Sequence, residues 1–212
     1  MVLRIEVGRF IEENCYVYFS ENFSSDGFYH GFLIDPGDES EKILREIESQ
    51  KILVEKILIT HGHHDHIGAL NNLQPILKCP IVMSKSGRKY SEDPVWNLSQ
   101  FFGDPIRFDE LPIEFLDNHS KISTSDQNLS LELIETPGHT LDGAIYYSAE
   151  DHLAFVGDTI FKNSFGRTDF PGGNFDELMK SIREIILKLP EDTKLFSGHM
   201  DSTTVENEKI LY

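Results

Sequence analysis

The segment HGHHDH, residues 61–66, puts four histidines and one aspartate into six positions. Imidazole and carboxylate side chains at this density are typical of a metal site. On extended backbone, residues i and i+2 point to the same side, so His61 and His63 can reach one ion. Asp65 and His66 follow where the chain is expected to turn into a helix, and this change of direction suits a second ion. A donor set without thiolate suits Zn²⁺, and also Fe or Mn.

Three further metal-capable side chains stand directly after predicted strands. They are His139 in TPGHT (136–140), Asp158 in GDT (157–159) and His199 in SGH (197–199). In each segment a glycine lets the backbone turn sharply at the strand end. We expect these strand ends to share one edge of a sheet and to complete the site that HGHHDH begins. No metal role is expected for the remaining histidines, which are His30, His64, His119 and His152.

The elements that must position these side chains follow from the pattern of apolar residues. Alternation and short apolar runs predict strands over 2–7, 15–19, 28–34, 52–59, 81–83, 129–135, 144–148, 153–156 and 194–197. Helical spacing predicts helices over 40–50, from a cap at Asp65 to Pro75, from Asn174 or Asp176 to Leu189, and shortly after Thr203. Two β-rich halves, each followed by helices, indicate two sheets packed face to face with helices outside.

Residues 85–125 are the least regular part of the chain. They are rich in Ser, Pro and Asp, and their aromatic residues are Tyr90, Trp96, Phe101, Phe102 and Phe108. We interpret this segment as an irregular, partly helical excursion that packs on the body, with a lid as the alternative interpretation.

Length and charge narrow the class of protein. The 212 residues are expected to form one domain, 1–212. A formal net charge of −17 weighs against binding to nucleic acid and to anionic membrane surfaces, because both attract clustered Lys and Arg.

Cys15 and Cys79 form no CxxC pair and are expected to be reduced and structural. Residues 1–10 show no signal-peptide pattern, and no apolar run approaches about 20 residues, so we expect a cytoplasmic location.

Taken in order, the motifs resemble those of the metallo-β-lactamase superfamily. They are Asp35 in IDPG (34–37), HGHHDH, His139, Asp158 and His199, and they extend over essentially the whole chain. The resemblance implies an α/β fold, the four-layer αββα sandwich, with the metal site at one edge of its two sheets. Within the superfamily the chain is similar to the compact, single-domain branch of the glyoxalase II-like (hydroxyacylglutathione hydrolase-like) enzymes. The segments that carry this similarity are NCY (14–16), TPGHT (136–140), GDTIF (157–161), GRTDFPGG (166–173) and TT (203–204).

The same resemblance implies roles for individual residues. The first ion would be held by His61, His63 and His139. The second would be held by Asp65, His66 and His199, and Asp158 would bridge both. Asp65 and Asp158 would also be catalytic, because they would position the attacking water and relay its proton.

Two residues outside the ligand set are also candidates. Asp35 would orient the ligand loop by hydrogen bonds, or would be no more than a turn residue before Pro36. Arg167 would grip a substrate carboxylate, or would form a salt bridge with Asp169.

These features predict a binuclear metallo-hydrolase that cleaves a small acyl thioester or related ester. Two divalent ions, Zn²⁺ before Fe or Mn, would lie about 3.5–4 Å apart and lower the pKa of a shared water from about 15.7 towards 7. The metal-bound hydroxide would attack the acyl carbonyl. The sequence contains no GxSxG motif, and this mechanism needs no protein nucleophile.

Two departures from the family pattern narrow the substrate. Glyoxalase II proper has a C-terminal helical domain with basic residues that bind glutathione, whereas this chain extends only about a dozen residues beyond His199. Specificity for glutathione thioesters is therefore not expected. Asp158 stands where the best-known lactamases place a Cys ligand, so antibiotic hydrolysis is not expected as the main activity.

Other functions stay open at this point. A mononuclear iron persulfide dioxygenase is the main alternative, because GRTDF (166–170) also resembles that family; its iron would be held by His61, His139 and Asp158. Lactonase and nuclease branches are further alternatives, and the charge disfavours the nuclease. A non-enzyme with a structural metal is disfavoured because structural zinc sites are closed, four-coordinate and usually Cys-rich. The natural substrate and the oligomeric state do not follow from the sequence.

Overall fold

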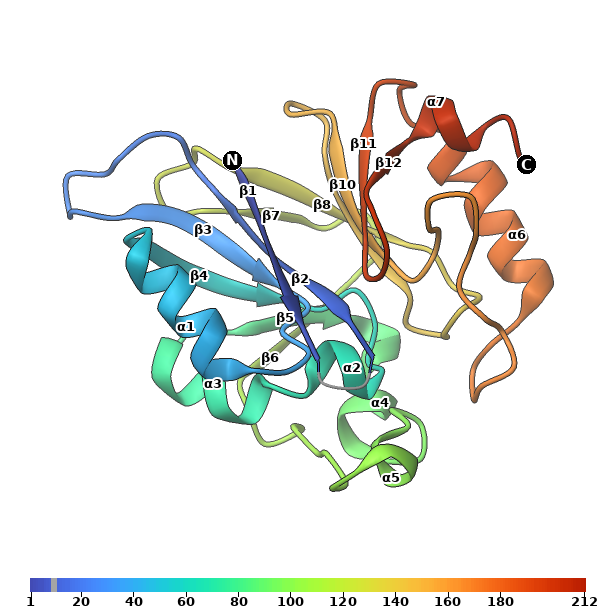
Figure 1. Ribbon diagram of the computed structural model, residues 1–212, viewed down its shortest axis with the longest axis horizontal. Coiled ribbons are helices and arrows are strands. Elements are labelled where there is room, and N and C mark those ends of the chain that lie inside the picture. Colours follow the sequence, from blue (N-terminus) through green and yellow to red (C-terminus); the bar gives the residue numbers. More distant parts are fainter. Residues whose placement is uncertain (9–10) are drawn as a thin grey trace.

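The first of two six-stranded sheets is built by the N-terminal half of the chain. The computed structural model describes residues 1–8 and 11–212 (Figure 1). The strands of this sheet lie in chain order, β1 (Val2–Val7), β2 (Glu13–Phe19), β3 (Tyr29–Ile34), β4 (Ile52–Leu58), β5 (Ile81–Ser84) and β6 (Ile113–Leu116). The pairs among β1, β2 and β3 are antiparallel, and those from β3 to β6 are parallel. The carboxyl ends of β3 and β4 therefore lie at the same edge.

The second sheet is built by the C-terminal half. Its spatial order is β12 (Thr203–Thr204), β11 (Lys194–Ser197), β10 (Leu153–Gly157), β9 (Ala144–Ser148), β8 (Ser130–Glu135) and β7 (Lys121–Ser123). Only β10 and β11 pair in parallel, and the other neighbours are antiparallel. The carboxyl ends of β10 and β11 thus lie side by side.

The main core lies between the two sheets. Alternation along β2 sends Tyr16 and Tyr18 into this core, while Cys15 and Val17 face the other side of the sheet. Aromatic rings fill much of the space, and the rings of Phe155 and Phe196 stack with centroids 5.3 Å apart. The same core takes apolar residues from both sheets, which explains why the sheets pack face to face.

Helices cover the two outer faces. On the first sheet lie α1 (Ser40–Ser49) and α3 (Leu70–Leu77), and on the second lie α6 (Phe175–Glu184) and α7 (Val205–Glu208), as Figure 1 shows. Three short helices, α2 (His64–Ile67), α4 (Arg88–Glu92) and α5 (Ser99–Phe102), lie together at one end of the sandwich. The predicted α/β fold with four αββα layers is confirmed.

One helix was predicted from Asp65 to Pro75, but the structure has two short helices there, α2 and α3, and both predicted ends were also wrong. The chain enters α2 at His64, without Asp65 as a cap, and α3 continues through Pro75 to Leu77. A proline inside a helix removes one backbone hydrogen bond and crowds the preceding turn. The helix persists because Leu70 and Leu73 are buried against the first sheet.

The helix predicted to run to Leu189 was also wrong at its end. Asn174 is the cap, as one of the two predicted starts, and its side chain accepts a hydrogen bond from the Glu177 amide. The α-helix ends at Glu184, and a 3₁₀ turn follows over Ile186–Lys188. This turn redirects the chain and buries Ile186 in the core under α6.

Residues 85–125 are only partly irregular. They contain a 3₁₀ turn at Lys85–Gly87, α4 and α5, as predicted, but also β6 and β7, which the sequence did not indicate. Both free cysteines are buried. Within the described residues, no helix has the length and apolarity needed to cross a membrane.

Candidate metal centre

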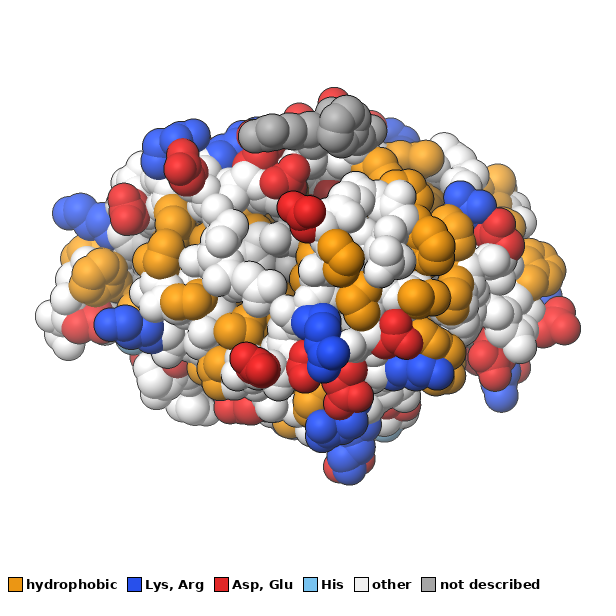
Figure 2. All heavy atoms as spheres, turned by 90° about the horizontal axis from the view of Figure 1, so that it is seen from below, with side chains coloured by type: hydrophobic (Ala, Val, Ile, Leu, Met, Phe, Trp, Pro, Cys, Tyr) orange, Lys and Arg blue, Asp and Glu red, His pale blue; other side chains and the backbone are white. Residues whose placement is uncertain are grey.

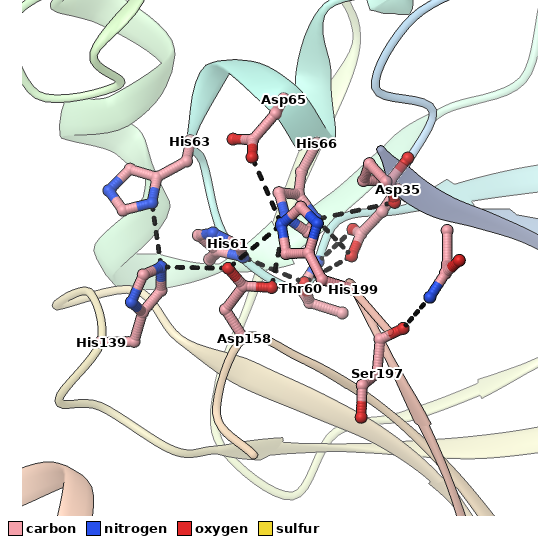
Figure 3. A network of polar contacts seen from close by, with 12 residues as sticks. Asp35, Thr60, His61, His63, Asp65, His66, His139, Asp158, Ser197 and His199 are labelled. Atoms are coloured by element: carbon pink, nitrogen blue, oxygen red, sulfur yellow. Dashed lines mark hydrogen bonds and ion pairs between the residues drawn. The ribbon is translucent and has the colours of Figure 1, made fainter. Parts of the chain in front are cut away.

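All seven predicted ligands lie at one edge of the sandwich, where strands of both sheets end (Figure 3). The first sheet brings four of them, because β4 leads directly into the HGHHDH segment and α2. The second sheet brings the other three from the loop between β8 and β9 and from the ends of β10 and β11. They are His139, Asp158 and His199.

Two clusters of donor atoms match the two predicted ion sites, and a third cluster, His61, His66 and Asp158, links them. His61, His63 and His139 form one, in which single ligand atoms lie within 4.8 Å of one another. The facing nitrogens of His63 (Nδ1) and His139 (Nε2) are 3.0 Å apart. Asp65, His66 and His199 form the other group, and an Asp65 carboxylate oxygen lies 3.4 Å from His199 Nε2.

Asp158 lies between these two groups. Its Oδ1 is 3.4 Å from His66 Nε2, and its Oδ2 is 3.6 Å from His139 Nε2 and 3.5 Å from His199 Nε2. This is the position a carboxylate would need to bridge two ions. The close approach depends on Gly198, because a Cβ there would lie 2.5 Å from both Asp158 Oδ1 and His66 Cε1.

Asp35 fixes the ligand loop from behind. Its carboxylate accepts hydrogen bonds from the Thr60 amide (2.8 Å) and hydroxyl (2.6 Å) and lies 3.1 Å from His66 Nδ1. Asp35 is buried and has a left-handed backbone with φ of 49°. A partner on Nδ1 leaves Nε2 of the same ring free to face the centre.

Two more histidines are oriented by backbone carbonyls. Nδ1 of His199 lies 2.6 Å from the Glu12 carbonyl, and Nδ1 of His139 lies 2.6 Å from the Arg167 carbonyl. As donors, these nitrogens hold each ring with Nε2 towards Asp158. These contacts with the Glu12 and Arg167 carbonyls therefore aim the imidazoles at the space between the two groups.

Buried atoms without partners show that the site suits metal ions. Among the described residues, the Nε2 atoms of His61, His63 and His66 and Oδ1 of Asp158 are buried and make no hydrogen bond. Buried polar atoms are nearly always paired, and an unpaired one is costly. Divalent ions at the centre would satisfy Nε2 of His61, Nε2 of His66 and Oδ1 of Asp158, so this donor set fits the metals that imidazole and carboxylate prefer.

The two groups differ in charge. Burial and neighbouring imidazoles lower the pKa of His61, and they lower that of His63 to about 3, so both rings are neutral. Burial opposes the charged form of His66 and His199 as well, but the neighbouring carboxylates, Asp158 first among them, together outweigh it and raise both pKa values, that of His199 to about 10. An ion in the second group would therefore replace protons, whereas one in the first group would meet neutral rings.

The structure adds a residue that the sequence analysis missed. Asp142 is buried, and its carboxylate accepts a 2.9 Å hydrogen bond from the amide of Gly62, which lies between His61 and His63. Burial raises the pKa of Asp142 to about 7. Nothing in the sequence marks it except its position three residues after His139.

Arg167 forms a salt bridge with the nearby Asp169 carboxylate. Its guanidinium donates two hydrogen bonds of 2.7 Å to the Asp169 carboxylate and lies over the Phe170 ring, 4.0 Å from the centroid. This is the salt bridge anticipated as the alternative. A role in gripping substrate stays a prediction.

Comparison with known proteins identifies the family. Residues 14–199 match the family model described as the metallo-beta-lactamase superfamily. The chain belongs to this superfamily. It is 34% identical to the hydroxyacylglutathione hydrolase GloC of Haemophilus influenzae, over 84% of this chain and 83% of that protein. It is 32% identical to the probable metallo-hydrolase YqgX of Bacillus subtilis, over 97% and 93% of the two chains.

Solved structures of the superfamily share the fold. The BLEG-1 B3 metallo-beta-lactamase superposes with a TM-score of 0.90 at 31% identity, covering 99% of this chain and 97% of that one. TTHA1623 in a di-iron-bound form superposes with a TM-score of 0.82 at 28% identity, covering 98% and 96%. The chain is therefore a member of a superfamily of metal-dependent hydrolases, and its relatives include proteins named hydroxyacylglutathione hydrolase.

Proposed function

We propose that this protein is a binuclear hydrolase of a small acyl thioester or related ester. The observation that carries the proposal is the place of Asp158 between two three-residue groups, each of which can hold one ion. Zn²⁺ is the ion we propose first, and Fe or Mn would suit the same nitrogen and oxygen donors. When bound, two such ions supply Lewis acidity and lower the pKa of a water shared between them.

Two carboxylates of this chain would position the attacking water and receive its proton. Asp65 is partly exposed and Asp158 nearly buried, so their carboxylates line the open and the inner side of the centre. Both can accept a hydrogen bond from the attacking water and take up its proton. The imidazoles of His66, His139 and His199, kept in place by Asp35 and by backbone carbonyls, would keep the centre rigid during the reaction.

Relatives support a hydrolase with two metals. GloC is named a hydroxyacylglutathione hydrolase and YqgX a probable metallo-hydrolase. TTHA1623 has been solved with two irons. These names suggest thioesters as the first substrates, and they suggest that iron is a serious alternative to zinc.

Two other activities, β-lactam hydrolysis and persulfide oxidation, should be tested beside thioester hydrolysis. BLEG-1, which is 31% identical, is named a B3 metallo-beta-lactamase, so a β-lactam should be included. A mononuclear iron dioxygenase would use His61, His139 and Asp158 and leave the second group without a metal. The gathering of Asp65, His66 and His199 around their own centre favours the hydrolase.

Elemental analysis of protein purified without added metal or chelator tests the proposal. We expect about two ions per chain and metal-dependent release of thiol from simple thioesters. About one iron per chain, with oxygen uptake on persulfides and no thioester cleavage, would replace the proposal by the dioxygenase. Cleavage of the β-lactam in preference to every thioester and ester would place the protein with the lactamases.

A further inference from the structure

His64 is the histidine of the HGHHDH segment that has no place in either ligand group. Its ring stacks on Phe102 of α5, with centroids 4.6 Å apart and planes inclined by 18°. Its backbone amide donates to the Asn97 carbonyl at 2.8 Å, which ties the start of α2 to the segment before α5. The next residue, Asp65, belongs to the second metal group, so the stack and that group share helix α2.

A cavity of about 740 Å³ opens at this stack and reaches Asp65. We call it the arm pocket and define it by Ile11, Asp38, His64, Asp65, Phe102 and Asp104. Its described lining comes from Gly8 and Ile11, from Gly37 and Asp38, from helix α2 and from the residues around α5. Because Asp65 belongs to both, a substrate whose reacting bond lies at the metal centre can extend one arm into this pocket.

The walls of the arm pocket combine apolar and acidic groups. Phe102 is 55% exposed and Ile11 is 40% exposed, so their apolar surfaces are available to a ligand. Asp38 and Asp104 supply carboxylates that neither metal group uses, and the described residues that line the cavity include no Lys or Arg. Figure 2 shows this end of the molecule, where apolar side chains gather in several patches among scattered charged ones.

We infer that the arm pocket binds one arm of the substrate and selects an apolar, flat arm that is uncharged or cationic. The inference rests on the proposed hydrolase function, since it assigns the pocket to part of the molecule that is cleaved. Phe102 is then a specificity-determining residue, because its ring, backed by His64, would stack on the arm. A negatively charged arm would face the Asp38 and Asp104 carboxylates, and the described lining offers it no Lys or Arg.

Binding of two thioethers to the zinc-loaded full chain tests this inference without requiring turnover. The probes are S-benzyl-N-acetylcysteamine, which is uncharged, and the same compound with a sulfonate on the ring, and their dissociation constants are measured by calorimetry. We expect the uncharged probe to bind about tenfold more tightly. Phe102→Ala should weaken its binding about fivefold.

Phe101→Ala is the matched control, because Phe101 is the neighbouring residue of α5, is 64% exposed and does not line the cavity. It should leave binding unchanged. The double variant Asp38→Asn, Asp104→Asn should bring the two probes to within about threefold of each other. Equal effects of Phe101→Ala and Phe102→Ala, no measurable binding, or tighter binding of the sulfonate would overturn the inference.

Arg9→Ala belongs in the series because the sequence places this cation between Gly8 and Ile11, which both line the cavity. A preference for the sulfonate that Arg9→Ala abolishes would show that the pocket takes anions, against the inference. The same proteins are assayed on the phenylacetyl thioester of N-acetylcysteamine. If the probes bind as expected but no thioester or ester is hydrolysed, the proposed function is overturned and the inference about the arm pocket is supported. If a thioester is hydrolysed but the probes do not bind in the expected order, the proposed function is supported and the inference is overturned.

Discussion

The Asp142 carboxylate and the Gly62 amide are joined by a 2.9 Å hydrogen bond that ties the loop after β8 to the loop after β4. These two loops carry the three imidazoles of the first metal group. Asp142→Ala would leave a buried amide without a partner, at a cost of about 1–3 kcal/mol in the free energy of unfolding. It should also weaken binding of the first ion about 10- to 100-fold.

Asp142→Asn is the matched variant, because its amide oxygen can still accept from Gly62. Zinc dissociation constants from competition with a chromogenic chelator, together with urea unfolding, distinguish the two. We expect the Asn variant to keep most of the affinity that the Ala variant loses. If both variants bound zinc like the parent protein, the link between the loops would have no role in metal binding.

His199→Ala removes one of three ligands from the second group only. We expect the metal content to fall from about two ions to about one and hydrolysis to fall by orders of magnitude. His152→Ala is the control, because His152 is exposed and pairs with Asp192 far from the centre. Unchanged turnover by His199→Ala at one ion per chain would contradict the binuclear assignment.

Binding of the second ion should depend on pH more steeply than binding of the first. Protons on His66 and His199, held there by the Asp158 carboxylate, must leave before an ion can bind. Because the pKa of His199 is raised to about 10, its affinity for metal should fall progressively as pH falls from 9 to 6. His63, with a pKa of about 3, imposes no such competition on the first ion in this range. Stepwise metal titrations at several pH values would measure both slopes, and parallel slopes would refute the prediction.

His30 is a histidine outside the metal centre, and its protonation is expected to affect only the stability of the fold. Its Nδ1 lies 2.5 Å from Glu55 Oε1 and its Nε2 lies 2.9 Å from Asp26 Oδ2. Burial opposes its charge, but the two carboxylates outweigh burial and raise its pKa above 6.5. The folded state therefore binds this proton more tightly than the unfolded state, and the resulting stability is complete below pH 6.5 and is lost as pH rises through the raised pKa.

The corresponding variant is His30→Gln, which can still form hydrogen bonds but does not titrate. Urea midpoints measured between pH 6 and 9 should fall less steeply with pH for this variant than for the parent protein. An identical slope for the two proteins would show that His30 gains no proton affinity on folding.

The sequence predicted the centre better than its surroundings, for a physical reason. Each ligand follows a strand, and the apolar strands are long enough to be recognised, so the convergence of HGHHDH with His139, Asp158 and His199 could be anticipated. The strands β6 and β7 have four and three residues and are mostly half-buried or exposed, so they carry no clear alternation. Asp142 and the His64–Phe102 stack depend on contacts between distant segments, which no local pattern encodes. That residues 1–212 form one domain, and that the seven residues bind metal, stay predictions.

Each of the two metal groups draws on both sheets. His61 and His63 come from the first sheet and meet His139 from the second, and Asp65 and His66 meet His199 in the same way. An ion in either group would thus link the two halves of the chain. Catalysis and the packing of the two sheets would then depend on the same metal–ligand bonds. A chelator that stops the reaction would also weaken the attachment of one sheet to the other at this edge.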